Sequence, residues 1–170
     1  MLKIPAIRAT LGKNIIAKLK NNKDDMERVI EFSLSHLSLT QQQLSDLVAC
    51  SKHERQFAEV AFVSRDAMSE LRHFKKLELG IEVHNAVLTL DRIGAKGSKV
   101  KLGGCSMKSI ELSFQSHERC ELDCRVWAPL EEHALYTLGA WGSQDLFVAI
   151  VSSNHGEEEP EKNNVLSLNG

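Results

Sequence analysis

The feature that most constrains the fold is a change of hydrophobic period after Lys76. In residues 77–83 an apolar side chain occupies every second position, which is typical of a strand with one buried and one solvated face. Short apolar or alternating segments follow at 87–90, 100–102, 110–114, 120–126 and 146–151. This half of the chain therefore predicts an antiparallel β-sheet or sandwich, interrupted by one late short helix in LEEHALYTLG.

The first half has a different spacing. Met26, Ile30, Leu34 and Leu37 recur every three or four residues, which predicts a helix over 24–37. Further helical runs extend to about residue 74. The expected fold class is thus α+β, with N-terminal helices at about 24–74 followed by the antiparallel sheet.

A capping-box pattern marks the start of one of these helices. Thr40 is followed three residues later by Gln43, so each side chain can bind the other residue's backbone amide. A helix is expected to begin directly after Thr40.

The composition is that of an ordinary globular protein. Of the 170 residues, 42% are hydrophobic and 26% are charged. We expect a single domain over 1–151: a basic arm or short helix at 1–21, a helical part at 24–74 and a β part at 76–151. The segment 152–170 is expected to be an acidic, flexible tail.

The net charge of -2 argues against a DNA mimic and against a strongly basic nucleic-acid binder. Residues 1–20 nevertheless contain five cations and no acid. Such a segment could contact anionic lipid, nucleic acid or an acidic protein partner, or it could simply be a solvated face. The chain has no apolar run long enough for a membrane span and no signal-peptide pattern. We therefore expect a cytoplasmic protein, which lies in the cytosol of the cell that expresses it.

The cysteines and histidines do not predict a metal site. In a strand, Cys120 and Cys124 would lie about 13 Å apart at roughly 3.3 Å per residue, too far for shared zinc coordination or a disulfide. Reduced, buried thiols are expected. Neither a glycine-flanked nucleophile nor a phosphate-binding loop is present, so we expect no cofactor and no enzymatic activity.

One segment of the first half, LTQQQLSDLVACSKHERQFAEV at 39–60, resembles the helix-turn-helix of bacterial transcription regulators. The resemblance implies a DNA-binding regulator that uses residues 40–60, in which Lys52, His53 and Arg55 face a groove. The alternative is two ordinary helices joined by a short turn. Two positions depart from the motif. Ala49 stands where glycine is usual, and Arg55 occupies an apolar anchor position, where burial of an unpaired charge would be costly.

The β half, from LELGIEVHNAVLTL through VKLGGCSMKSIELSF to LFVAIV, resembles the layout of small uncharacterised phage and prophage proteins. The likeness covers residues 77–151 and rests on strand order, a GGC-containing hairpin and the late helix. It implies a non-enzymatic accessory protein of a mobile element that binds a host or phage protein complex and inhibits a host defence complex. Oligomeric state does not follow from it.

Candidate partner-binding residues are exposed aromatic and cationic side chains, the kinds that dominate interfaces. Trp127 and Arg125 share the solvated parity of their strand, and Trp141 follows the glycine expected to end the late helix. The basic arm adds Lys13, Lys18 and Lys20. The alternative for both tryptophans is that they close the end of the sheet.

Overall fold

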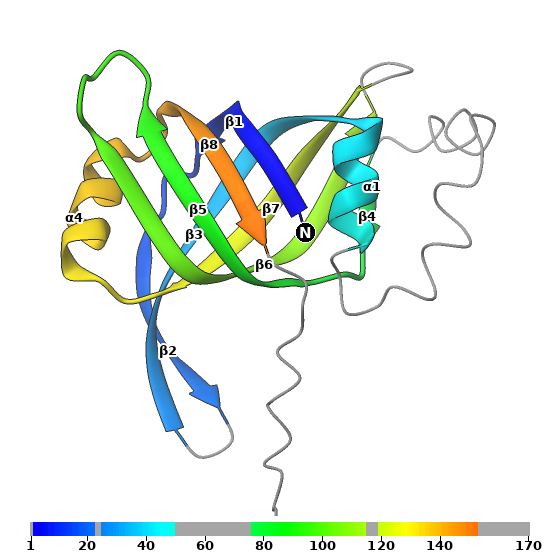
Figure 1. Cartoon of the computed structure of the whole chain (residues 1–170). Helices are drawn as coiled ribbons and strands as arrows, with labels where there is room; N and C mark the ends of the chain where they lie inside the picture. Colours follow the sequence, from blue (N-terminus) through cyan, green and yellow to red (C-terminus); the bar gives the residue numbers. More distant parts are fainter. Residues whose placement is uncertain (1, 23–24, 50–75, 115–118, 153–170) are drawn as a thin grey trace, which may run out of the picture.

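The computed structural model describes residues 2–22, 25–49, 76–114 and 119–152 (Figure 1). In chain order the elements are β1 (Leu2–Leu11), β2 (Ile16–Asn22), β3 (Asp25–Thr40), α1 (Gln41–Ala49), β4 (Leu77–Leu79), β5 (Val83–Arg92), β6 (Lys99–Phe114), β7 (Arg119–Pro129), α4 (Glu132–Trp141) and β8 (Asp145–Ser152).

Six of the strands form a closed antiparallel barrel. They follow the order β1-β8-β5-β6-β7-β3, and β1 closes the ring by pairing with β3. The closing seam consists of two residue pairs, Thr10 with Ser35 and Leu11 with Leu34. Outside the ring, β2 pairs with β3 and β4 pairs with β6.

The predicted α+β class with N-terminal helices is therefore wrong. The expected basic arm at 1–21 contains β1 and most of β2, and the expected helix at 24–37 lies almost wholly in β3. Most of the remaining predicted helical part, residues 50–75, lies outside the described residues.

Bulges at residues with positive φ bend several strands around the barrel. His36 (φ 59), Asn85 (φ 53) and Ser109 (φ 49) each coincide with a shift of register, in β3, β5 and β6 respectively. A bulge inserts one residue, increases the local twist and bends the strand, as closure of a small barrel requires. Asn85, which lies between the predicted strand segments 77–83 and 87–90, is thus a bulge within the single strand β5.

The later strands agree better with the sequence pattern. The alternation at 120–126 and the apolar run at 146–151 fall in β7 and β8, and β8 lies between β1 and β5. The GGC segment does not form a hairpin. Gly103 and Gly104 lie within the continuous 16-residue strand β6, where Gly104 has a φ of 64°.

The predicted capping box is present. The Thr40 amide donates to Oε1 of Gln43 at 2.9 Å, and the Gln43 amide donates to Oγ1 of Thr40 at 3.2 Å. Helix α1 begins at the next residue and buries Leu44 and Leu47 completely. Its starting point could be read from sequence because capping chemistry is local.

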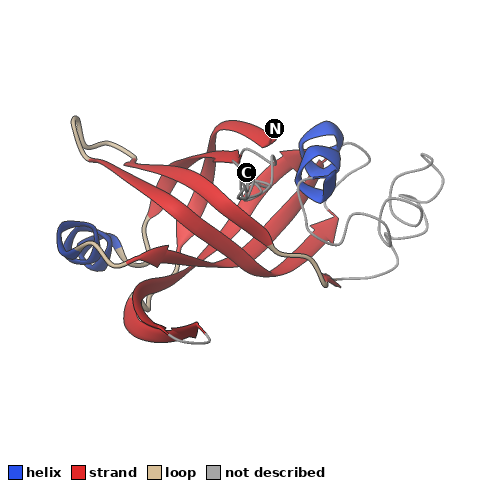
Figure 2. Ribbon diagram, turned by 60° about the horizontal axis from the view of Figure 1, so that its bottom comes forward, coloured by secondary structure: helices blue, strands red, loops and turns tan. Residues whose placement is uncertain are grey.

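The two described helices cover opposite ends of the barrel (Figure 2). Helix α1 follows the end of β3 and α4 follows the end of β7, and these strands are antiparallel neighbours. Helix α4 continues past Gly139, the expected end, to Trp141, and buries Ala134, Leu138 and Trp141. Neither helix has the length and apolar character needed to cross a bilayer.

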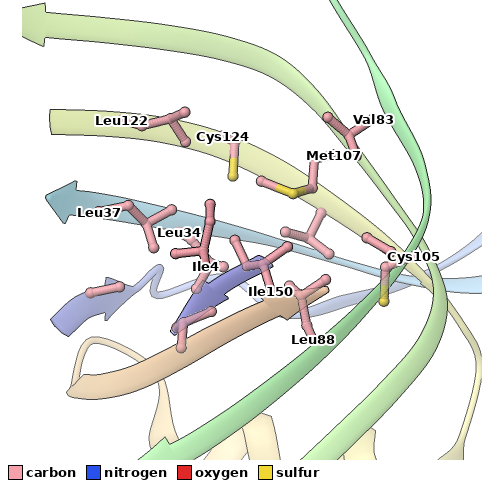
Figure 3. Close-up of a cluster of buried hydrophobic side chains, with 14 of the residues drawn as sticks. Ile4, Leu34, Leu37, Val83, Leu88, Cys105, Met107, Leu122, Cys124 and Ile150 are labelled. Carbon is pink, nitrogen blue, oxygen red and sulfur yellow. The ribbon is translucent and has the colours of Figure 1, made fainter. Parts of the chain in front are cut away.

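Hydrophobic side chains fill the barrel interior (Figure 3). Eight strands leave an interior just wide enough for side chains, and six strands leave less. In the described part of the chain, every buried side-chain nitrogen or oxygen has a hydrogen-bond partner. The barrel interior is therefore a hydrophobic core.

Candidate functional site

Trp127 stands on the outer wall of the barrel. Its neighbours along β7, Val126 and Ala128, are fully buried, so alternation directs Trp127 outward, where it is half-buried. It lies opposite Glu31 on β3 and opposite Ser106 on β6. The parity predicted for Trp127 is observed, and so is that of Arg125, which is exposed on the same face.

Lysine ammonium groups from two other strands lie near the Trp127 ring. Nζ of Lys108 on β6 is 4.7 Å from the ring centroid, and Nζ of Lys20 on β2 is 5.8 Å from it. Both distances fall within the roughly 6 Å range of a cation–π interaction. We call this region of the outer wall the Trp127 surface; it comprises Lys18, Lys20, Glu31, Lys108, Arg125 and Trp127.

Glu31 connects the cations of the Trp127 surface. Its side chain is only 11% exposed, and one carboxylate oxygen accepts a hydrogen bond from Nζ of Lys18 at 2.8 Å. The other oxygen lies 3.9 Å from Nη1 of Arg125. A nearly buried carboxylate requires such partners because desolvating an unpaired charge is costly. Glu31 thus joins Lys18 of β2 and Arg125 of β7 through one carboxylate group.

On the Trp127 surface and its border, cations slightly outnumber carboxylates. Its four cations contrast with one carboxylate in the set, while Glu82, 3.4 Å from Nζ of Lys108, supplies a second at the border. Glu27 adds a third opposite Lys20. The side chain of Arg125 is 64% exposed and that of Lys18 is 46% exposed. An approaching molecule would therefore meet accessible cations around an aromatic ring.

A series of polar contacts between three side chains, Glu82, His84 and Ser106, borders this surface. Oε2 of Glu82 lies 3.2 Å from Nε2 of His84, and Nδ1 of His84 lies 3.2 Å from Oγ of Ser106. An acid, an imidazole and a hydroxyl in this order can activate a nucleophile. Ser106, however, is only 8% exposed, which leaves little access for a substrate. We interpret these three side chains as a polar contact that links β5 and β6.

The remaining predicted site residues lie elsewhere. Trp141 is 4% exposed at the barrel end, so the alternative interpretation, closure of the sheet end, describes its place. Lys13 is exposed in the connection between β1 and β2, outside the Trp127 surface. The predicted DNA-contacting residues Lys52, His53 and Arg55 lie outside the described residues.

Sequence reasoning missed Glu31 and Lys108. Both belong to strands that lie beside β7 in the folded barrel. The helical spacing of residues 24–37 predicts a helix at Glu31. Had β3 been recognised as a strand, the parity of Glu31, opposite to that of Ile30 and Phe32, would have placed it on the outer face.

The three described cysteines are buried thiols, as expected. Burial raises the pKa of Cys105 and of Cys124 to about 12 and that of Cys120 to about 11. Cys120 and Cys124 both face the interior from β7. Within the described ranges no group of three or more histidine, cysteine or acidic side chains could hold a metal ion.

No protein-family model matches this chain, and neither a curated protein nor a solved structure shows significant similarity to it.

Proposed function

We propose that this protein is a non-enzymatic binding protein that docks a protein partner on the Trp127 surface. The observation that supports the proposal is the position of Trp127, a large aromatic side chain on the outside of the barrel, flanked by the ammonium groups of Lys20 and Lys108. Tryptophan and arginine contribute disproportionately to binding energy at protein interfaces, and Arg125 lies on the same face.

The packed interior supports the same proposal. The described side chains inside the barrel are hydrophobic and form one buried cluster, so most of the polar and charged groups that could contact a partner lie on the outer wall. Binding on the outer wall uses groups that the fold itself does not need to bury.

Origin from a phage or prophage, and inhibition of a host defence complex, remain predictions; infection assays with cells that express the protein would test them.

Quantitative capture from nuclease-treated host lysate tests the docking proposal. The bait is the full chain in three forms: wild type, Trp127→Ala and Phe147→Ala. Phe147 is the matched control because it is an aromatic residue, 43% exposed, on the outer wall of β8. Strand β8 lies three strands from β7 in either direction around the ring.

We expect a protein to be retained by the wild type and by Phe147→Ala but lost with Trp127→Ala. Equal retention by all three baits, or retention of no protein at all, would overturn the proposal. Nucleic acid that is retained without nuclease and lost at high salt would instead favour the DNA-binding alternative, because phosphate contacts release counterions.

A further inference from the structure

Strand β2 has one free edge. Each of the six ring strands has a neighbour on both sides, whereas β2 pairs only with β3 among the strands that the structure describes. The described residues of β2 are largely open to solvent, and Leu19 is 60% exposed. The β2–β3 hairpin extends away from the barrel (Figure 1), and β3 residues 25–28 pair with β2 but not with β7. Unpaired strand edges of this kind readily accept another strand.

The strand with the free edge contributes two lysines to the Trp127 surface, Lys18 and Lys20. Ile16, Lys18 and Lys20 share one face of β2, on which Nζ of Lys18 reaches Glu31 and Nζ of Lys20 reaches the Trp127 ring. Leu19 points to the opposite face. A strand added to this edge would therefore meet two lysines on one face and an apolar side chain on the other.

A second copy of the chain is a poor occupant of this edge. When two identical strands pair about a two-fold axis perpendicular to the sheet, opposed residues share a face, so their numbers have the same parity. Every such pairing of five or more residues within Ile16–Asn22 then places a lysine opposite a lysine. The possible centres give Lys18 against Lys18, Lys18 against Lys20, or Lys20 against Lys20. Like charges directly opposite each other are destabilising.

We propose that β2 accepts an extended acidic segment of a protein partner as an additional strand. The complementary pattern is acidic, apolar, acidic: the two acidic side chains oppose Lys18 and Lys20, and the apolar one lies beside Leu19. Main-chain hydrogen bonds hold such a strand, and alternate side chains select it. The inference rests on the proposed function, since it specifies the chemistry of the partner and its mode of binding.

Defined peptides test this mode of binding on the full-length chain. The first probe is an acetylated, amidated seven-residue peptide in which glutamate alternates with valine. A second replaces glutamate by lysine, and a third places proline at the central position, where it removes a backbone donor. Amide hydrogen exchange measures protection of β2, and a titration measures affinity.

We expect the acidic peptide to protect amides of Ile16–Asn22 and to bind at least about tenfold more tightly than the lysine peptide, because the lysine peptide sets like charges opposite Lys18 and Lys20. The proline peptide should give less protection. In Lys18→Glu/Lys20→Glu the preference should reverse. The neutral variant Lys18→Gln/Lys20→Gln should lose the preference, and it keeps the test valid if the charge-reversed protein does not fold.

Equal binding of acidic and basic peptides, or protection confined to residues outside β2, would overturn the inference, as would absence of binding at millimolar peptide. These outcomes are separable from failure of the proposed function. A lysate partner that requires Trp127 but is indifferent to the lysine substitutions supports docking on the Trp127 surface and overturns strand addition. If the acidic peptide protects β2 but retention of the lysate partner is unchanged by Trp127→Ala, strand addition is supported and docking on the Trp127 surface is overturned.

Discussion

Lys18 and Glu31 form an ion pair between β2 and β3, with Nζ 2.8 Å from Oε2, in which only the lysine is well exposed. Loss of Lys18 leaves a nearly buried carboxylate whose other cation, Arg125, is 3.9 Å away. This arrangement differs from a fully exposed surface pair, because desolvation makes the carboxylate depend on its partner.

A double-mutant cycle with Lys18→Met and Glu31→Gln should therefore give a coupling energy of about 0.5–1 kcal/mol. Urea denaturation measures it. The control pair is Lys99 and Asp91, which are 3.8 Å apart and more exposed, and its coupling should be near zero. Equal coupling in the two pairs would show that the burial of Glu31 has no energetic consequence.

Gly12 adjoins the seam that closes the barrel. Its amide donates to the Ser33 carbonyl at 2.9 Å, and a Cβ at this position would lie 2.0 Å from Oγ of Ser33. Gly12→Ala should reduce the free energy of unfolding by about 1–3 kcal/mol through overpacking. Ser33→Ala in the same chain should restore part of it, because a contact of 3.3 Å with Cβ of residue 33 remains. Gly80→Ala, which meets no atom within 4 Å, is the control.

The reciprocal bonds between Thr40 and Gln43 predict a measurable capping energy. Thr40→Ala should lower the free energy of unfolding by about 1 kcal/mol, since it removes the acceptor for a free helix amide. Gln42→Ala in the same helical turn is the control, because the side-chain hydrogen bond of Gln42 to Asp46 is exposed and does not cap the helix. A smaller loss for Thr40→Ala than for Gln42→Ala would contradict this prediction.

His36 predicts a small pH dependence of stability. Its hydrogen bond to Glu121, with Nδ1 3.1 Å from Oε2, raises the pKa of His36 above the ordinary value. The resulting stabilisation is fully present below the unfolded-state pKa and is lost as pH rises through the folded-state pKa. It should amount to at most a few tenths of a kcal/mol, because the pair is exposed to solvent.

Unfolding of the wild type and of His36→Asn at about pH 5.5 and about pH 8.5, on either side of the ordinary histidine pKa, measures this effect. Asparagine is the suitable replacement because it tolerates the positive φ of residue 36. The difference in free energy of unfolding between the wild type and His36→Asn should be greater at the lower pH. A difference that does not change with pH would rule out the ion pair as its source.

The buried cysteines predict selective resistance to alkylation. Because the thiolate is the reactive form, Cys105, Cys120 and Cys124, with pKa values raised to about 11 or 12, should remain unmodified by iodoacetamide in the native protein at about pH 8. Mass spectrometry should find all three alkylated in denaturant. If Cys124 in the native protein were modified as fast as a solvent-exposed thiol, its placement in the core would be contradicted.

The misreading of β3 as a helix has a specific physical cause. Its inward residues run Ile30, Phe32 and Leu34, and the bulge at His36 then shifts the next inward residue to Leu37. The resulting intervals of four and three between Ile30, Leu34 and Leu37 match helical spacing. Only Phe32, between the first two, indicates the strand. A bulge thus hides the period of two from a reading based on selected apolar positions.

The site was predictable only within one strand. Alternation along β7 placed Trp127 and Arg125 on the outer face, since the parity of a strand is a local property. That Lys20, Glu31 and Lys108 lie beside them depends on the pairing of four strands, and two of these strands, β3 and β7, are far apart in sequence. Barrel closure depends likewise on contacts that no local pattern encodes.

The pairing of β1 with β8 also has a consequence for the order of events during synthesis. Leu2 lies opposite Ser152, so β1 acquires this neighbour only after 150 further residues have been synthesised. Until then β1 and β5 lack the strand that lies between them, and the ring cannot close in its native order. Contacts so distant in sequence slow folding, and this protein should acquire its native state only after translation of β8 is complete.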